Sequence, residues 1–424
     1  MDLHGNSLLK ETTPEGNIDQ NVFDIQQGVA ILIAVREKDH SDYGSTTYKS
    51  RDGVKEMAKV LYYDLWGRRE DKYNFLESAS LHNIDWIEVK PTEPNYFFAP
   101  KDFDLATEYN QGCLISDIFI INSSGFTTHR DNFAIDFDRD VIKKRIRDLI
   151  SEDLSNDYLQ ELYSIHDSRD WNLAEARKQV RKNLNWENDL ISCLYRPFDK
   201  RFCYLSTVAM DFPRPPLKQH LIQDNLSLLC NRQLSIMGWR HIFVTNSVPE
   251  ICSISSASRE RTYVFPLYTY PNTENKQTNL FLEKTPNLSP KFLETIKEKL
   301  GKIPTPEQIF YYAYAIFHSP TYRTRYAEFL KIDFPRLPLT SNQNLFNSLA
   351  IKGEELVNLH LMKSDTLNNL MTTYQQIGDN QITEVTYNVE LQRVYSTFLF
   401  KVPHLNSQKV YGTRVIGFRF VPDS

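Results

Sequence analysis

The chain has 424 residues, enough for two or three domains, and its 41% hydrophobic and 24% charged residues are ordinary values for a globular protein. A net charge of −5 argues against nucleic-acid binding over the whole surface, but residues 190–261 hold nine Lys and Arg against five Asp and Glu, which allows a local basic face. Without a long apolar run, a secretory signal or a CxxC pair, the sequence predicts a cytoplasmic protein with reduced thiols and no membrane contact.

Motifs for catalysis and cofactor binding are missing from this sequence. It contains 14 glycines but no GxG, so it lacks the turn that lets a backbone approach a nucleotide phosphate. It also lacks HExxH, GxSxG and a clustered Cys/His set. One weak match places Asp64 upstream of Glu88 and Lys90, as in magnesium nucleases, but such a triplet is common by chance, and an edge strand with outward charges is the favoured explanation. We therefore predict no catalytic residue and no metal site.

The N-terminal quarter alternates strand-like and helix-like segments. Residues 22–35 predict a loop that leads into a buried strand, GVAILIAV, covered on both faces because it lacks polar alternation. Residues 69–77 are helix-like, and the prolines of residues 89–100 require an extended or looped path.

Helical spacing returns in residues 139–163 and 172–185. The second of these segments has an apolar stripe and a basic face, which can be a solvated face or a phosphate-contacting one. The stripe is formed by Leu173, Ala176, Val180 and Leu184, and the basic face by Arg177, Lys178, Arg181 and Lys182.

Residues 190–270 alternate short apolar runs with turns and predict strands. Helix signals follow: Ser289-Pro290 and Gly301 predict the two ends of one helix, and Thr305-Pro306 predicts the start of another. We expect two helical pieces around Gly353 and strands after residue 380.

Two groups of polar residues are suited to contact DNA. The turn NSSGFTTHRDN (122–132) carries hydroxyls that can position phosphates or can cap their own backbone. Arginine can bond guanine through two donors, and Asn or Gln can do the same with adenine. The candidate turn residues are Ser123, Ser124, Thr127, Thr128, His129 and Arg130. The candidate residues further along the chain are Arg196, Lys200, Arg201, Asn231, Arg232, Gln233, Arg240 and His241.

Several long motifs between residues 2 and 362 resemble the C-terminal part of Type ISP and related single-chain restriction–modification enzymes. These enzymes carry an adenine-N6 DNA methyltransferase followed by a target-recognition domain. The motifs include DLHGNS (2–7), NVFDIQQGVAI (21–31), YYDLWGRREDKY (62–73), SSGFTTHRDNFAIDFDRD (123–140), CLYRPFDKRF (193–202), FPLYTYP (265–271) and AIFHSPTYRTRYAEFLKIDFPRLPL (315–339).

The resemblance implies an α/β and α+β fold in three parts. Residues 1–120 would be the remnant of a methyltransferase sheet, 121–345 a mixed α+β target-recognition domain, and 346–424 a C-terminal extension of helices and strands. The tail after residue 380 departs from the family, which closes with a Trp-containing strand segment near an IGGYQV-like run.

The family's S-adenosylmethionine loop and NPPY motif would lie upstream of DLHGNS and are not in this sequence. The resemblance therefore implies a fragment that begins inside the methyltransferase domain and binds no cofactor itself. Phe23 matches the position at which related enzymes stack an aromatic ring on a flipped adenine, and a core residue beside the strand is the alternative.

These features together predict a protein that recognises a specific sequence in double-stranded DNA. An N-terminal methyltransferase or helicase–nuclease chain would be a further partner. Two alternatives stay open: an active methyltransferase half completed by a partner chain, and an inactive gene fragment, which exposed apolar surface would favour.

Overall fold

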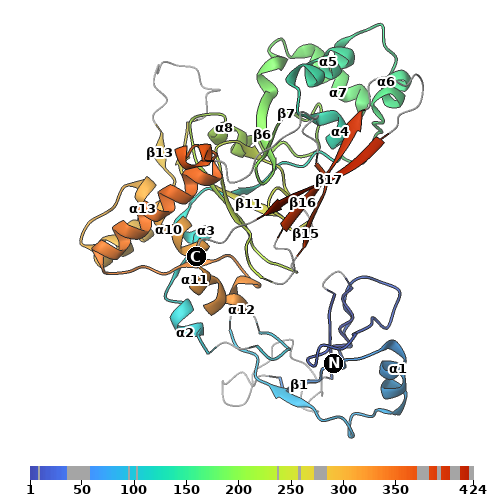
Figure 1. Cartoon of the computed structure of the whole chain (residues 1–424), viewed down its shortest axis with the longest axis vertical. Coiled ribbons are helices and arrows are strands. Elements are labelled where there is room, and N and C mark those ends of the chain that lie inside the picture. The colour runs from blue at the N-terminus through green and yellow to red at the C-terminus, as the bar shows by residue number, and fades with distance from the viewer. Residues whose placement is uncertain are drawn as a thin grey trace, which may run out of the picture. The chain divides into compact units, whose positions relative to one another are not determined.

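A computed structural model describes residues 1–7, 10–35, 58–93, 96–101, 104–235, 238–255, 259–271 and 284–369, and the backbone alone of 382–388, 393–401 and 411–419. The chain divides into two compact units, Met1–Leu361 and Met362–Ser424. Its several helices and small sheets confirm the predicted α/β and α+β class (Figure 1). The predicted domain boundaries near residues 120 and 345 stay predictions. Among the described helices, none is both long and apolar enough to cross a bilayer.

The larger unit contains short strands and longer helices. Its strands are β1 (Val60–Tyr62), β2 (Ile87–Val89), β3 (Cys113–Leu114), β4 (Ser123–Ser124), β5 (Ile135–Asp136), β6 (Leu190–Arg196), β7 (Asp199–Tyr204), β8 (Ser227–Asn231), β9 (Ile242–Thr245), β10 (Val248–Pro249), β11 (Thr262–Pro266), β12 (Tyr268–Thr269), β13 (Thr285–Pro286) and β14 (Arg336–Leu337). Its helices are α1 (Arg69–Ser78), α2 (Ala106–Tyr109), α3 (Ile115–Ile118), α4 (Asp131–Ala134), α5 (Arg139–Ile150), α6 (Asn156–Tyr163), α7 (Leu173–Lys182), α8 (Pro215–Leu221), α9 (Pro290–Leu300), α10 (Pro306–His318), α11 (Pro320–Arg325), α12 (Ala327–Leu330) and α13 (Gln343–His360).

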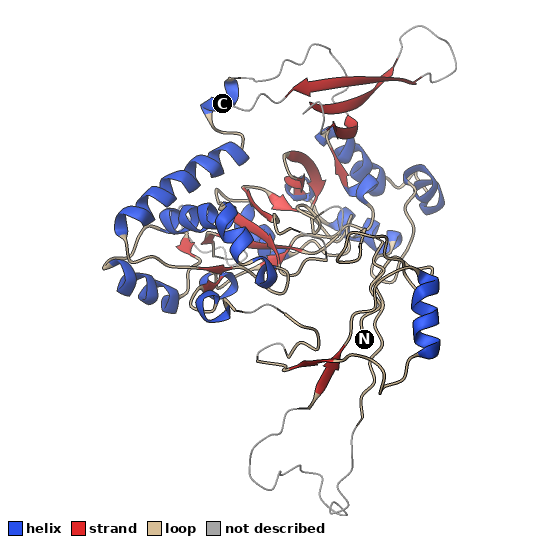
Figure 2. Cartoon of the chain, turned by 60° about the horizontal axis from the view of Figure 1, so that its bottom comes forward, coloured by secondary structure: helices blue, strands red, loops and turns tan. Residues whose placement is uncertain are grey.

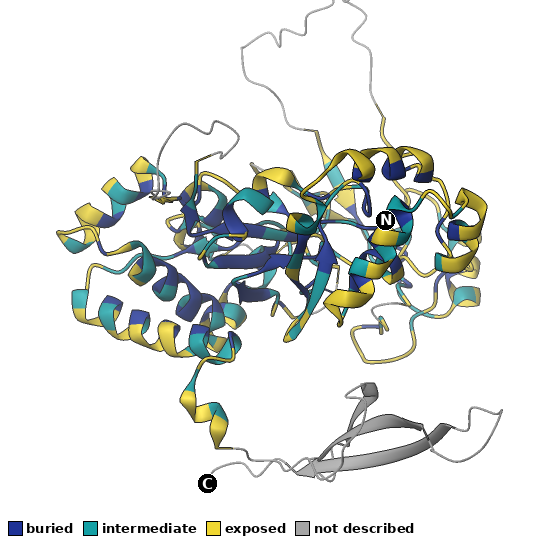
Figure 3. Cartoon of the chain, turned by 90° about the horizontal axis from the view of Figure 1, so that it is seen from above, coloured by how far each residue is buried: buried dark blue, intermediate teal, exposed yellow. Residues whose placement is uncertain are grey.

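A four-stranded sheet in the order β4-β11-β8-β9 is buried on both faces. Leu228 and Cys230 of β8 belong to a core shared with the helices α10 and α13, whereas Leu229 belongs to a second core shared with α5 and α7. This alternation follows from the two-residue period of a strand. The burial explains why the middle of β8, Leu228 to Cys230, is apolar, and Figure 3 shows these central strands as buried.

The second core lies between this sheet and a further sheet in the order β10-β6-β7-β5. β6 and β7 form an antiparallel hairpin, and β10 pairs with β6 in parallel. These elements confirm the strands predicted within residues 190–270, and they fix the positions of the basic residues on the hairpin.

On the other face of the central sheet, the helix ends follow the sequence signals. Ser289 caps α9, and Gly301 ends it at a φ of 73°, as predicted. Thr305 starts α10 with a reciprocal capping box. The expected break at Gly353 was wrong, because α13 continues through it. A Cβ there would lie 1.8 Å from the carbonyl oxygen of Tyr311, so glycine lets α10 and α13 approach closely.

Helices α5, α6 and α7 confirm the predicted helical segments, with two corrections on α7. Leu184 lies beyond the helix and is 92% exposed, so it is not part of the apolar stripe. Arg177 is buried rather than solvated or free to meet a phosphate. It donates to the carbonyls of Leu149, Ser151 and Leu154, and so satisfies the C-terminal end of α5.

The N-terminal region, residues 1–93, has a small core of its own formed by Leu3, Val22 and Leu65. Figure 2 shows much of this region as loop. The predicted buried strand in residues 22–35 was wrong: the described segment has one isolated bridge, between Ala30 and Asp2, and Leu32 is 74% exposed. An apolar run becomes a buried strand only where another strand hydrogen-bonds to it and other side chains cover it. Among the described residues, neither a strand partner nor such a cover is present beyond residue 31.

The smaller unit contains β15 (Ile382–Asn388), β16 (Arg393–Lys401) and β17 (Tyr411–Arg419) after a short 3-10 turn at Asp365–Asn368. The three strands form an antiparallel sheet in the order β15-β16-β17, which confirms the strands predicted after residue 380.

Candidate nucleic-acid interface

The polar turn 122–132 is built into the central sheet. Ser123 and Ser124 form β4 and pair with β11. A Cβ at Gly125 would lie 2.7 Å from the backbone of Glu250, so this position requires glycine. Thr127 then bridges Phe212 through two backbone hydrogen bonds. The turn is therefore held along its length by strands and neighbouring loops.

The four hydroxyl residues of this turn are buried or half-buried, and one of them bonds within the turn. Ser124 and Thr128 are buried, and Ser123 and Thr127 are half-buried. The Thr128 hydroxyl bonds Asp131 and accepts the backbone N–H of Arg130, which is the self-capping alternative.

Two residues of the turn, His129 and Arg130, meet one aspartate. Arg130 donates to Asp211 at 2.7 Å, lies 4.0 Å over the ring of Trp171 and has a side chain only 7% exposed. His129 also pairs with Asp211, but its side chain is 58% exposed, at a backbone φ of 54°. Arg130 therefore anchors the turn, and His129 is the group that a partner can reach.

The β6–β7 hairpin carries two arginines held by carboxylates. Arg196 donates to Glu250 at 2.7 Å, and Arg201 makes a two-point contact with Asp199 at 2.9 and 2.7 Å. Both guanidinium groups lie about 4 Å over the ring of Tyr195. Burial raises the pKa of the Glu250 carboxyl, an effect that its bonds from the Cys252 N–H and Arg196 oppose.

The hairpin and the polar turn lie beside each other. The Tyr195 hydroxyl donates to Asp131 at 2.8 Å, and the backbone N–H of Ile251 donates to Phe126 in the turn. Lys200, on the same hairpin, is exposed and donates to Asn246 at 2.9 Å. The structure thus brings residues 123–130 and 195–201 together.

The triplet at 231–233 divides into one structural and two accessible residues. Asn231 is buried and donates to the carbonyls of Glu260 and Arg261 at 3.2 and 2.9 Å. Arg232 donates through Nε to Asp333 at 2.7 Å while its side chain stays 54% exposed, and this bond to Asp333 raises the pKa of Arg232. Gln233 is exposed.

Arg240 and His241 precede β9. Arg240 is exposed, whereas His241 is half-buried and burial lowers the pKa of its ring. Taken together, the accessible candidates are His129, Lys200, Arg232, Gln233 and Arg240.

The aspartates that orient these arginines were missed in the sequence. Asp199 stands two residues before Arg201 on one hairpin, so the strand alternation could have suggested that pair. Asp333 lies 101 residues from Arg232, and no local pattern connects them.

Phe23 is 56% exposed, so the core alternative does not hold. Its backbone N–H donates to the Asn21 side chain and its carbonyl accepts from Arg69, which fixes the position of the loop. Stacking on a flipped base stays a prediction.

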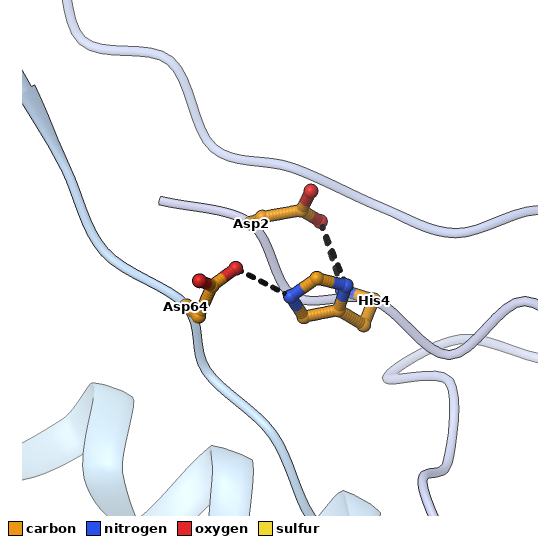
Figure 4. Close-up of side chains that lie close together, drawn as sticks. All are labelled: Asp2, His4 and Asp64. Atoms are coloured by element: carbon orange, nitrogen blue, oxygen red, sulfur yellow. Dashed lines mark hydrogen bonds and ion pairs between the residues drawn. The ribbon is translucent and has the colours of Figure 1, made fainter. Parts of the chain in front are cut away.

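A group of metal-ligand type lies in the N-terminal region (Figure 4). Nε2 of His4 lies 2.7 Å from Asp64, and Nδ1 lies 3.8 Å from Asp2, with the ring stacked on Trp66. Such atoms can hold a divalent cation. Here, however, the close approach of His4 to Asp64 already forms a hydrogen-bonded pair, and Glu88 contacts Lys59 instead of joining the group. We assign no metal to it.

Solved structures share the fold of this chain. A cryo-EM structure of the DrdV–DNA complex matches with a TM-score of 0.58 and 21% identity, over 85% of this chain and 34% of that one. A nuclease-deletion mutant of the Type ISP enzyme LlaGI in complex with a DNA substrate mimic matches with a TM-score of 0.57 and 19% identity, over 93% of this chain and 35% of that one. The ATP-dependent Type ISP enzyme LlaBIII bound to DNA matches with a TM-score of 0.63 and 20% identity, over 93% of this chain and 25% of that one.

The chain spans about a third or less of the length of these proteins, and at such identities the likeness concerns the fold. No curated protein matches it. The fold is therefore shared with parts of DrdV and of two Type ISP restriction–modification enzymes. Residues 117–405 match the model of the Type ISP C-terminal specificity domain, and the chain belongs to that family.

Proposed function

We propose that this chain recognises a specific sequence in double-stranded DNA, as the specificity part of a restriction–modification adenine-N6 methyltransferase. The observation that carries the proposal is the match of residues 117–405 to a specificity domain. DNA in the three similar structures supports the choice of ligand. The free thiols of all five cysteines agree with a cytoplasmic location, which is part of the proposal.

The arginine geometry supports base reading at Arg232. Asp333 holds the guanidinium through Nε, so both Nη groups stay available for the two acceptors of a guanine edge. An arginine oriented by an aspartate loses less conformational entropy when it binds. Lys200 and His129 are accessible for phosphates, which position the duplex without reading it.

The methyltransferase portion is a finer proposal. Catalysis would use S-adenosylmethionine bound outside this sequence, and Phe23 would stack on the extruded adenine because its ring is exposed.

A second candidate function is a methyltransferase half completed by another chain. The exposed apolar run Ile31–Val35 favours it, since a sheet from a partner could cover these side chains. The same surface also suits an inactive fragment. Mixing the chain with a methyltransferase partner separates the two: methyl transfer supports the first, and its absence supports the second.

Selection of bound sequences from random duplexes, at a stated salt concentration, tests the leading proposal. The wild-type chain should enrich one sequence. Arg232→Ala should relax the preference at one base pair by about 1–3 kcal/mol. Arg147→Ala is the matched control, because Arg147 is an exposed arginine of the same domain whose contact is with Glu187. An unchanged preference after Arg232→Ala rejects the base-reading role, and the absence of any enriched sequence rejects the function.

A further inference from the structure

A cluster of cationic and imidazole side chains lies where the start of β9 meets the ends of α10, α11 and α13. Arg240 and His241 precede β9, His318 ends α10, Arg323 belongs to α11, and His360 ends α13. The rings of His318 and His360 lie 5.2 Å apart. Burial lowers the pKa of both rings, and the positive charge of Arg323 lowers it further. These residues therefore form one electrostatic neighbourhood.

Arg323 differs from the other arginines of the interface. Its Nε donates to the carbonyl of Phe317 at 2.7 Å, and its guanidinium lies 5.7 Å from the ring centre of Trp239. Among the described residues, no carboxylate oxygen lies within 4.0 Å of Arg323 or of Arg240, whereas Arg130, Arg196, Arg201 and Arg232 each have one. Burial lowers the pKa of Arg323, and the charge of Arg240 lowers it further.

Buried nitrogen atoms without hydrogen-bond partners lie beside these arginines. The indole Nε1 of Trp239 is buried and has no partner among the described residues, although the residue is only 4% exposed. Nδ1 of His241 also has no partner among the described residues, and the tautomer of the ring decides whether it donates or accepts. A buried donor without an acceptor costs about 1–3 kcal/mol, and a partly buried charge without a counterion costs more. The cluster therefore has donors and positive charge in excess.

The histidines are placed to respond to an anion. Nδ1 of His318 donates to the Tyr314 carbonyl at 2.9 Å, and the Tyr314 hydroxyl bonds Nδ1 of His360. Burial lowers the pKa of His318 to about 4, so the ring is neutral at pH 7. The charged group that faces all three histidines is Arg323, and Glu260 also faces His241. Arg240 acts on Arg323.

We propose that Arg240 and Arg323, with the indole N–H of Trp239, bind a phosphate group of the DNA backbone. The proposal rests on the proposed function, because it takes DNA as the source of the phosphate. Two guanidinium groups supply the charge and donors that a phosphodiester accepts, and the contact positions the duplex rather than reading it. A bound phosphate also raises the pKa of His318 and His360. Binding therefore takes up protons, and affinity rises as the pH falls toward the pKa of these rings in the complex.

The test measures binding of a 30-base-pair duplex to the full chain by fluorescence anisotropy over a range of salt concentrations. Arg240→Gln and Arg323→Gln should each weaken binding roughly tenfold at 0.1 M salt, and each should reduce the slope of log K against log salt by about 0.9. Arg325→Gln is the matched control and should bind as the wild type does, because Arg325 is exposed and paired with Glu108. Arg240 is exposed, so its variant tests the site even if Arg323→Gln lowers the melting temperature.

A pH series supplies a readout that a purely structural role would not change. The wild-type chain should bind the duplex more tightly at pH 5.5 than at pH 7.5, and His318→Gln should reduce that difference. Unchanged affinity and salt slope in both arginine variants, with a wild type that binds the duplex, overturn the phosphate site and leave the proposed function standing.

Inorganic phosphate distinguishes the source of the anion. Titration of the wild-type chain with phosphate alone should give no saturable binding in the millimolar range. If phosphate saturates the wild type, fails to bind both arginine variants, and no duplex binds, the site takes a free anion and the DNA assignment is overturned together with the proposed function.

Discussion

The N-terminal region and the layered part of the larger unit, from residue 104 to Leu361, obtain their stability in different ways. The layered part surrounds the central sheet with two extensive apolar cores. The N-terminal region buries three core residues and leaves the apolar side chains of residues 31–35 exposed. An apolar run in the layered part is buried, whereas the apolar run at residues 31–35 is exposed, because burial of a run depends on the segments that cover it.

A buried ion pair takes the place of a large core in the N-terminal region. Lys72 and Asp19 are fully buried and lie 2.7 Å apart, and Lys72 also donates to the carbonyls of Leu3 and Gln20. The Lys72 amine therefore connects three parts of the region: the N-terminal segment at Leu3, the loop at Gln20 and helix α1.

The largest expected effect comes from removing that amine. Lys72→Met leaves the Asp19 carboxylate buried without its partner, which should destabilise the N-terminal region by about 3–5 kcal/mol. Hydrogen exchange should show peptides from residues 1–35 and 58–80 losing protection, while peptides from residues 190–270 keep theirs. Lys90→Met, at an exposed position, is the control. Equal loss of protection in both regions would show that they unfold as one.

Two leucines make the comparison sharper. Leu229 is fully buried in the central sheet, so Leu229→Ala should cost about 3 kcal/mol in the free energy of unfolding. Leu32 is 74% exposed, so Leu32→Ala should change it by less than about 0.5 kcal/mol. Urea denaturation measures both. A comparable cost at Leu32 would mean that residues 31–35 are covered in solution.

A smaller effect is expected from pH. Because burial lowers the pKa of His318 to about 4, from an ordinary 6.5, the unfolded chain binds this proton at a higher pH than the folded chain. The stability that depends on neutral His318 is complete above pH 6.5 and is lost as the pH falls toward 4. The loss between pH 7 and pH 5 is about 2 kcal/mol.

His318→Gln should remove most of this pH dependence in urea denaturation at the two pH values. His82→Gln, at an exposed position in the N-terminal region, should leave it unchanged. If the two variants lose stability equally on acidification, His318 does not titrate as the structure implies.

Local signals in the sequence predicted local structure well. The caps at Ser289 and Thr305 and the strands of residues 190–270 follow from neighbouring residues, and each is present. Errors arose where distant contacts decide. Gly353 looked like a helix break but serves the contact with Tyr311, and Arg177 looked solvated but bonds the end of α5.

The candidate site follows the same rule. Residue type pointed to arginines, but whether an arginine is accessible depends on its carboxylate partner. Arg130 is buried against Asp211 and Trp171, whereas Arg232 is held by Asp333 and stays exposed. The two-residue spacing that places Arg201 beside Asp199 on β7 is short-range, but the approach of Asp333 to Arg232 depends on the whole fold.

The most direct test of the account is hydrogen exchange of the full chain with and without a duplex selected from a random pool. DNA should protect peptides that contain Lys200 and Arg232, in the layered part of the larger unit, and should leave peptides from residues 58–93 unchanged. Protection confined to the N-terminal region, or none at a saturating concentration of duplex, would contradict the claim that the layered part carries the DNA-reading surface.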